Sequence, residues 1–359
     1  MATPVQSTIK AKRIFEVGVE TVAGTPVAAT RIIRNRNVTW GDSGSWRKYV
    51  PPYDIGRLSL RPDIGEITRK GFTGRVETDL SFEDVLLPLL SGHKGGVTPT
   101  EKTAMQADQE WIFKHTPITG DPIPDTFTWK QRYANGAGNF DREAAFGLVT
   151  GYDISADEGG DATLLNYDLI ARTAADDPSF DSLTLPTPFD MLAALDWKLY
   201  IDDSWAAMDV DDGLPSYGGG TQISSTLRSF TWRYKGGIDP ALFIGDGRLD
   251  MSTYRYGVRG VELELEFEFN GSADTERGKF ETPSKRFIRL LGEGSQIATG
   301  YNKTVLLQGA FDYVDNGFGE LGRDANGNDV VALRLETLAD DNVNDVEVRV
   351  INTLTGFPA

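Results

Sequence analysis

The sequence predicts a mainly β protein, and three observations favour that class. Stretches that alternate apolar and polar residues recur along the 359-residue chain, as they do in strands that bury one face. Glycine is over-represented, with 39 residues against a usual share of about 7%, and 17 prolines add further chain breaks. Asn-Gly dipeptides, which favour tight turns, separate several of the alternating stretches.

The strand predictions follow this alternation in chain order. Residues 75–82 read RVETDLSF, which places Glu77 and Asp79 on the charged face of a strand. Residues 262–269 read ELELEFEF and repeat the pattern more strictly. The remaining predicted strands cover residues 148–156, 163–172, 305–314, 330–337 and 346–352.

Two short helices are predicted between the strands. The first covers residues 82–91, where Ser81 and Asp84 have the spacing of a capping box. The second covers residues 283–291 and has Pro283 at its first position, where the missing backbone N–H costs nothing.

Features of the first half of the chain recur in the same order in the second half. Residues 38–40 (VTW) match residues 230–232 (FTW), and the two acidic strands at 75–82 and 262–269 match each other. Arg57-Leu58 likewise matches Arg248-Leu249, and each acidic strand precedes a predicted helix with a Leu-Leu pair. This order predicts one fold duplicated within the chain.

The predicted boundary between the two copies lies in residues 176–188, which contain three prolines. We therefore predict two tandem β-sandwich or barrel domains, each with a short helix, over residues 1–185 and 186–359. The second domain carries an acidic, glycine-rich segment at residues 202–220, which we expect to form an exposed loop.

The charge balance excludes several classes of protein. The chain has 53 acidic and 36 basic residues, a formal net charge of −17, two histidines and no cysteine. Thiol chemistry and a disulfide framework are therefore excluded. Such an acidic chain is a poor binder of a phosphate backbone. The apolar runs are short, so we expect no membrane span.

The charge is also uneven along the chain. Residues 1–75 hold 13 basic and 6 acidic residues, so the excess of acid lies in the remainder. A basic leading segment and an acidic body could join copies head to tail. The alternative is that Arg31, Arg34 and Arg36 simply solvate one face of a strand.

Motifs for catalysis or cofactor binding are lacking. Residues 271–279 miss the Walker spacing, and residues 324–335 lack the glycine and the final glutamate of a calcium loop. His93 and His115 adjoin no nucleophile motif, and we predict them at the surface or at a sheet edge. We expect no enzyme activity, no cofactor and no metal, and a hydrolase with clustered carboxylates is a weaker alternative.

The clearest functional signal is the run of four glutamates in the strand at residues 262–269. Strand geometry places their carboxylates on one face, where they repel one another unless cations or a function compensate. The face is either an ordinary solvated surface or a wall that must stay negative, and the matching acids Glu77 and Asp79 favour the wall. The four glutamates are Glu262, Glu264, Glu266 and Glu268.

Three phrases of the sequence match a known pattern. Residues 16–30 contain G-x-E-x-x-x-G-T-x-V, formed by Gly18, Glu20, Gly24, Thr25 and Val27. Residues 71–82 (GFTGRVETDLSF) and the S-x-x-R-x-F phrase at 225–230, which leads into residues 261–269, extend the match into both halves. In these phrases the chain resembles bacteriophage tail tube proteins, the major tail proteins of long, non-contractile tails.

The resemblance implies two tail-tube-like β domains whose copies form rings, and rings that stack into a tube conducting DNA during genome ejection. One such fold per chain implies a hexameric ring, whereas two imply a trimer with pseudo-sixfold symmetry. The implied partners are other copies of the chain, the tape-measure and other tail proteins, and DNA in transit only. The implied location is the virion tail, assembled in the host bacterial cytoplasm.

On this view the negative wall lines the lumen, where it repels phosphate and does not capture DNA. The predicted lumen residues are Glu77, Asp79, Glu262, Glu264, Glu266 and Glu268. Residues 41–56 and 234–247, at matching places after the paired tryptophans, are predicted to be hairpin loops that contact the next ring. Their contact residues are Trp46, Tyr49, Pro51, Pro52, Tyr53, Ile238, Pro240, Leu242 and Phe243.

A different class of function remains open from the sequence. Exposed aromatic residues such as Trp205 and Tyr217 could bind sugars, in which case the chain would be a virion decoration protein or adhesin for host-surface glycans.

Overall fold

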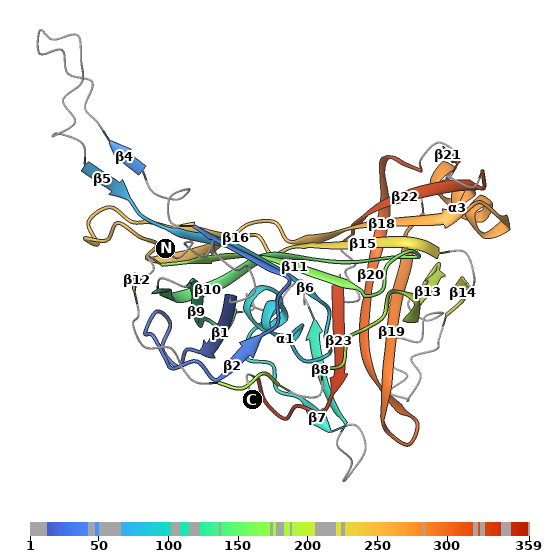
Figure 1. The fold of residues 1–359 in the computed structure, drawn as a ribbon. Coiled ribbons are helices and arrows are strands. Elements are labelled where there is room, and N and C mark those ends of the chain that lie inside the picture. The colour runs from blue at the N-terminus through green and yellow to red at the C-terminus, as the bar shows by residue number, and fades with distance from the viewer. Residues whose placement is uncertain are drawn as a thin grey trace, which may run out of the picture.

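Strands make up most of the structure, as predicted (Figure 1). It is a computed structural model, and it describes residues 13–41, 47–49, 66–101, 108–114, 123–135, 138–172, 175–176, 183–186, 189–204, 220–223, 227–282, 284–318, 322–323, 327–338 and 346–357. Within these ranges no helix is both long enough and apolar enough to cross a membrane.

The largest feature is an antiparallel sheet that runs through both halves of the chain, which we call the front sheet. It is the long upper layer of Figure 1. The long strands β10 and β20 contribute only their second halves to it. In spatial order its strands are β3 (Asn37–Gly41), β6 (Phe72–Asp79), β11 (Leu164–Ala171), β10 (Gly138–Asp157), β15 (Leu227–Lys235), β18 (Gly260–Glu268), β22 (Asp329–Thr337) and β20 (Tyr301–Phe318).

Behind this sheet, two smaller groups of strands pack against it. The first contains β2 (Arg31–Ile33), β1 (Arg13–Val19), β9 (Phe127–Asn135), the first half of β10 and β12 (Ala175–Asp176). The second contains β14 (Gln222–Ile223), β13 (Trp197–Asp202), β19 (Arg286–Ala298), the first half of β20, β23 (Val346–Asn352), β8 (Gln109–Lys114) and β7 (Thr100–Glu101).

The pairings have the same order in the two halves. The first half pairs its strands in the order β2-β1-β9-β10-β11-β6-β3. The second half pairs them in the order β14-β13-β19-β20-β22-β18-β15. The halves meet where β10 pairs with β15, from Gly151 opposite Lys235 to Asp157 opposite Ser229. The front sheet is therefore continuous across the predicted boundary at residue 185, and the division into two domains stays a prediction.

Each half also inserts a small hairpin at the same place. Strands β4 (Arg47–Tyr49) and β5 (Glu66–Arg69) lie between β3 and β6 along the chain. Strands β16 (Ile238–Ala241) and β17 (Thr253–Tyr256) lie between β15 and β18. A short strand β21 (Gly322–Arg323) pairs with the start of β22, and a 3₁₀ turn η3 (Ala194–Asp196) precedes β13.

The core lies between the front sheet and the strands behind it. Alternate side chains of the front strands point into this layer, among them Val76, Ile154, Trp232, Leu263 and Leu335, and all of them are buried. Removing this apolar surface from water is the main force that holds the layers together. The period-two pattern therefore identified the inward face of β6 and β18, the two strands for which a face was predicted, correctly.

Every predicted strand is present, and all but one have shifted ends. The prediction for residues 346–352 matches β23 at both ends. The predictions for residues 148–156 and 305–314 were too short, because β10 and β20 continue from the strands behind into the front sheet. The strand predicted at 75–82 begins at Phe72 and ends at Asp79.

The predicted helix at residues 82–91 occurs as a turn followed by α1 (Leu86–Pro88) and a π-helical turn η2 (Leu89–His93). The Asp84 backbone N–H donates to Ser81 Oγ at 3.0 Å, which is one half of the predicted capping box.

The helix predicted at residues 283–291 is wrong, because β19 begins at Arg286. This segment pairs with β13 on one side and with β20 on the other, and two sheet partners outweigh the local helix signals. The helix of this region is α3 (Gly271–Glu281), which begins earlier and is capped by the Asn270 side chain. The match between the two Leu-Leu pairs fails for the same reason, since Leu290-Leu291 lies in a strand.

Candidate functional site

The four glutamates of β18 lie on one face of the front sheet, which we call the outer face. Their neighbours Val261, Leu263, Leu265 and Phe267 are all buried on the opposite side. The strict alternation fixes this orientation, because a one-residue slip would bury four carboxylates in an apolar core.

Glu77 and Asp79 of β6 belong to the same outer face. Their neighbours Val76 and Thr78 point inward and are buried. From β6 the pairings lead through β11, β10 and β15 to β18, four steps of about 4.8 Å each. The two acidic clusters, nearly 190 residues apart in the sequence, therefore lie about 19 Å apart on one surface.

The strands between them add further charged side chains to the outer face. Asn166 lies opposite Glu77, and Asp153 lies between Asn166 and Arg233, whose other neighbour is Glu262. The carboxylates that the register places on the outer face are Glu77, Asp79, Asp153, Asp157, Asp168, Glu262, Glu264, Glu266, Glu268, Asp312 and Glu336. The cationic side chains on it are Arg75, Arg233, Lys235 and Arg334.

These cations bind carboxylates of the same face. Arg75 lies 3.3 Å from Asp168 and 3.4 Å from Asp153, and Arg233 lies 3.3 Å from Asp153. Arg233 also lies 3.4 Å from Glu262, which forms a second ion pair with Lys235. The hydrogen bond from Lys235 holds the pKa of Glu262 below its usual value, so this carboxylate stays ionised near neutral pH.

Acid remains in excess after this pairing. Arg334 reaches Glu264 at 3.5 Å, but Glu266, Glu268, Glu336 and Asp157 form no ion pair with any residue of the described ranges. Glu262 lies directly opposite Glu336 on β22, an arrangement that costs stability through like-charge repulsion. The outer face is thus a broad negative surface whose cations are already engaged.

The sequence prediction missed several members of this surface. Asp153, Asp168 and Glu336 are single acids in separate strands, so no local run marks them. The alternation within residues 148–156, 163–172 and 330–337 was the available signal, but only strand pairing shows that these faces coincide.

The two hairpins lie at one end of the front sheet, where Figure 1 shows β4–β5 projecting beyond the body of the molecule. Tyr49 in β4 is 52% exposed and Phe243 after β16 is 53% exposed. Pro240 and Leu242 are half-buried, whereas Ile238 lies in a small core cluster with Phe146, Leu148 and Met251. The other predicted contact residues, Trp46, Pro51, Pro52 and Tyr53, lie outside the described residues.

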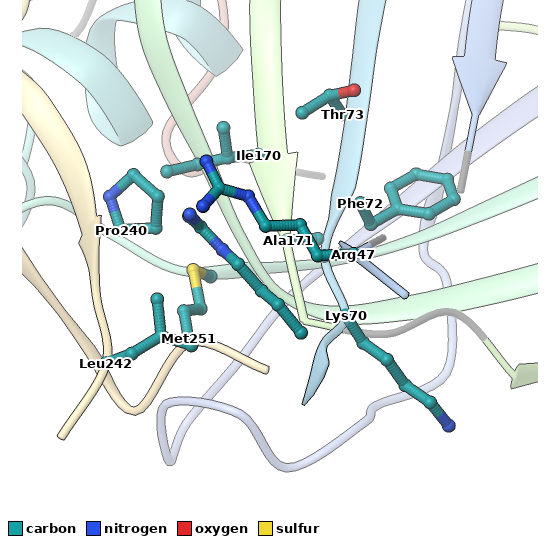
Figure 2. A pocket seen from close by; sticks show the side chains of 11 residues that line it. Arg47, Lys70, Phe72, Thr73, Ile170, Ala171, Pro240, Leu242 and Met251 are labelled. Carbon is teal, nitrogen blue, oxygen red and sulfur yellow. The ribbon is translucent and has the colours of Figure 1, made fainter. Parts of the chain in front are cut away.

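A cavity of about 260 Å³ lies between the two hairpins (Figure 2). Arg47 and Arg69 come from β4–β5, and Pro240, Leu242 and Met251 come from the β16–β17 segment. The cavity is therefore cationic on one side and apolar on the other.

His93 does not lie at the surface, and that prediction is wrong. The residue is 1% exposed, and its ring stacks on Tyr234 at 4.6 Å between centroids and meets the Tyr152 hydroxyl through Nδ1 at 3.2 Å. The residues of α1 and η2 are all buried, because their leucines pack in the core, and His93 at the end of η2 is buried with them. Burial raises the pKa of Tyr152 and Tyr234, so both phenols remain protonated in this packing.

Arg31 is not a solvated residue of a strand face. It is buried and bonds to Asp84 through Nε at 3.0 Å and Nη2 at 2.9 Å. Arg34 instead stacks on Phe189 at 4.2 Å, and Arg36 pairs with Asp79 at 2.5 Å.

The remaining sequence predictions concern metal binding, His115 and the proposed sugar-binding aromatic residues. Across the described segments, no group of three or more metal-ligating side chains is gathered at one place. His115, Trp205 and Tyr217 lie outside the described residues, as does most of the predicted acidic loop at 202–220.

Comparison with known proteins adds no family to this geometry. No protein-family model matches the chain, and no curated protein is significantly similar to it.

Proposed function

We propose that the chain is a structural subunit of a phage tail tube, whose copies form stacked rings with the outer face lining the lumen. The observation that carries this proposal is the continuous negative face to which both halves of the chain contribute. Phosphate is repelled by such a wall, and the cations on it already bind carboxylates, so DNA finds few groups that would hold it.

The duplicated fold predicted from the sequence is part of this proposal. It is supported by the identical pairing order of the two halves and by the matching positions of their hairpins. On this view β3, β6, β11 and β10 correspond to β15, β18, β22 and β20. Each half then supplies four strands to the front sheet.

The pairing that joins the two halves within one chain suggests how neighbouring copies pair. Strand β10 of the first half pairs with β15 of the second, and β20 and β3 are the equivalents of these two strands. In the described part of the chain, β3 pairs only with β6, and residues 312–318 of β20 pair only with β22. We infer that β20 of one copy pairs with β3 of the next, which repeats the internal joint and closes a ring.

Ring size follows from the strand count. Three chains of two repeats give 24 strands, which at about 4.8 Å spacing and about 40° tilt make a barrel about 48 Å across between backbones. Six chains would double that diameter to about 96 Å by the same geometry. The trimer with pseudo-sixfold symmetry leaves a lumen for one duplex, so we favour it over the hexamer.

The remaining parts of the proposal follow from the resemblance to tail tube proteins. The subunit would be made and assembled in the host bacterial cytoplasm and would reside in the virion tail. There it would contact the tape-measure and other tail proteins, with DNA only in transit and no enzymatic role.

Electron microscopy of the purified full chain tests the proposal. We expect rings with a central hole, threefold symmetry and six similar lobes, and tubes at higher protein concentration. Monomers at all concentrations, or oligomers without a hole, would refute it. Binding of the monomer to a glycan array would instead support an adhesin.

A further inference from the structure

We infer that the cavity between the two hairpins binds the acidic β10–β11 turn of a second copy of this chain in the neighbouring ring. This inference rests on the proposed function, and it names one specific contact that would hold stacked rings together. The β10–β11 turn is defined here as residues 157–161.

Two arginines form the cationic side of the cavity. Arg47 and Arg69 lie directly opposite each other in the β4–β5 register. Figure 2 shows Arg47 extending across the cavity toward Ile170 and Pro240, whereas Lys70 points away from it. Like charges at directly opposed strand positions destabilise a hairpin.

An acid from another molecule would relieve this repulsion. Neither Arg47 nor Arg69 forms an ion pair with a residue in the described ranges. Arginine in particular binds carboxylates through paired hydrogen bonds, so the two guanidinium groups suit an acidic loop.

The other side of the cavity is apolar and continues onto exposed apolar surface. Met251 and Leu242 line it, and Met251 is buried against the core. Tyr49, two residues after Arg47 on β4, and Phe243 and Ile244, which directly follow Leu242, are exposed large apolar side chains of the same two hairpin segments. A partner that covers these side chains would bury apolar area while its acids reach the arginines.

The β10–β11 turn has the complementary charge. Its sequence is Asp-Glu-Gly-Gly-Asp, and its three acidic residues are exposed. Glu158 pairs with Arg228, and the Asp157 carboxylate accepts a 2.9 Å hydrogen bond from the Gly159 N–H, which shapes the turn. Asp161 has no such partner in the described structure and is the best candidate to meet the arginines.

The two features lie at opposite ends of one strand. Strand β11 begins at Leu164, next to the turn, and ends at Ala171, which lines the cavity. Copies stacked along the direction of the front strands therefore bring the turn of one copy toward the cavity of the next. A contact of this head-to-tail kind repeats without limit, as a tube requires.

Charge reversal tests the contact in the full chain, with tube formation scored by sedimentation and electron microscopy. Asp161→Lys and Arg47→Glu should each raise the protein concentration needed for tubes at least tenfold while leaving single rings. The double variant Asp161→Lys with Arg47→Glu restores opposite charges and should restore tubes. Glu101→Lys, the same reversal at an exposed site on β7, is the matched control and should assemble like the wild type.

Circular dichroism and thermal unfolding show whether each variant is folded. Arg69→Glu, on the strand opposite Arg47, is a second charge reversal in the cavity and should impair tube formation in the same way. Wild-type tubes with unaffected Asp161→Lys and Arg47→Glu variants would overturn this inference and leave the proposed function intact. A double variant that stays defective would also overturn it. A wild-type chain that forms neither rings nor tubes would overturn the proposed function, and this contact with it.

Discussion

Removing the Asp84 carboxylate should destabilise the subunit strongly, because it leaves a buried arginine without its counter-charge. Both side chains of the Arg31–Asp84 pair are only 4% exposed. The guanidinium makes two hydrogen bonds to Oδ1, at 3.0 and 2.9 Å, and lies over the Phe357 ring at 5.3 Å. The pair thus ties β2 and the C-terminal segment to the turn before α1.

The magnitude follows from the burial of both charges. Loss of one partner of a buried ion pair typically costs about 3–5 kcal/mol, since the remaining charge stays desolvated. We expect Asp84→Ala to lose about this much free energy of unfolding. Replacing both partners by apolar residues, in Arg31→Met with Asp84→Leu, should recover most of the loss, because no buried charge then remains.

Urea unfolding of the monomeric chain, followed by tryptophan fluorescence, measures these differences. Asp274→Ala is the matched control, since Asp274 pairs with Arg277 at 2.7 Å with both side chains at least half exposed. An exposed pair of this kind contributes about 1 kcal/mol or less. A loss of stability in Asp84→Ala no larger than that in Asp274→Ala would refute the prediction, and so would a double variant no more stable than Asp84→Ala alone.

Three further predictions concern the lumen, the irregular pairing of β10 with β9 between Ala144 and Gly147, and acid stability. Lysine at all four glutamate positions of β18 should permit assembly but slow genome delivery, and unimpaired delivery would contradict a lumen role for this face. Gly147→Val should destabilise the chain by at least about 2 kcal/mol in urea unfolding. Even a Cβ atom at this position would lie 2.5 Å from Trp129 Cε2 and 2.6 Å from Phe127 O. An unchanged urea midpoint would refute this prediction. The hydrogen bond from Lys235 lowers the pKa of Glu262 in the folded state. The ionised Glu262 side chain therefore stabilises the fold at pH values above the ordinary carboxyl pKa of 4.5, and this stabilisation is lost as the pH falls through the lower pKa of the folded state. Lys235→Met should therefore reduce stability near pH 7 but not near pH 2, and equal losses at both pH values in thermal unfolding would refute the assignment.

The local sequence pattern predicted a strand correctly where strand pairing in the folded chain agrees with that pattern. In β18 the alternation of acid and apolar residues is complete, and the observed burial follows it residue by residue. In β19 the local pattern predicted the wrong element. Pro283 and the Leu-Leu pair favoured a helix, yet pairing with β13 and β20 decided for a strand, and these partners lie far away in the sequence.

Single residues show the same limit. His93 has loop-like glycines beside it, but its apolar neighbours in α1 and η2 carry it into an aromatic cluster. Arg31 has the sequence context of a solvated arginine, but Asp84, 53 residues later, supplies the counter-charge that allows its burial. No local signal contains either partner.

The sequence by itself determined the β class, the inward face of the strongly alternating strands and the acidic character of the chain. These depend on short-range periodicity and composition, which each segment carries alone. Only the tertiary structure decided that acids from two distant strands share one face, that their cations are engaged, and that two hairpins enclose a cationic cavity. Those properties arise from strand pairing and register, which join segments that lie far apart in the sequence, so that no short stretch of residues contains the information.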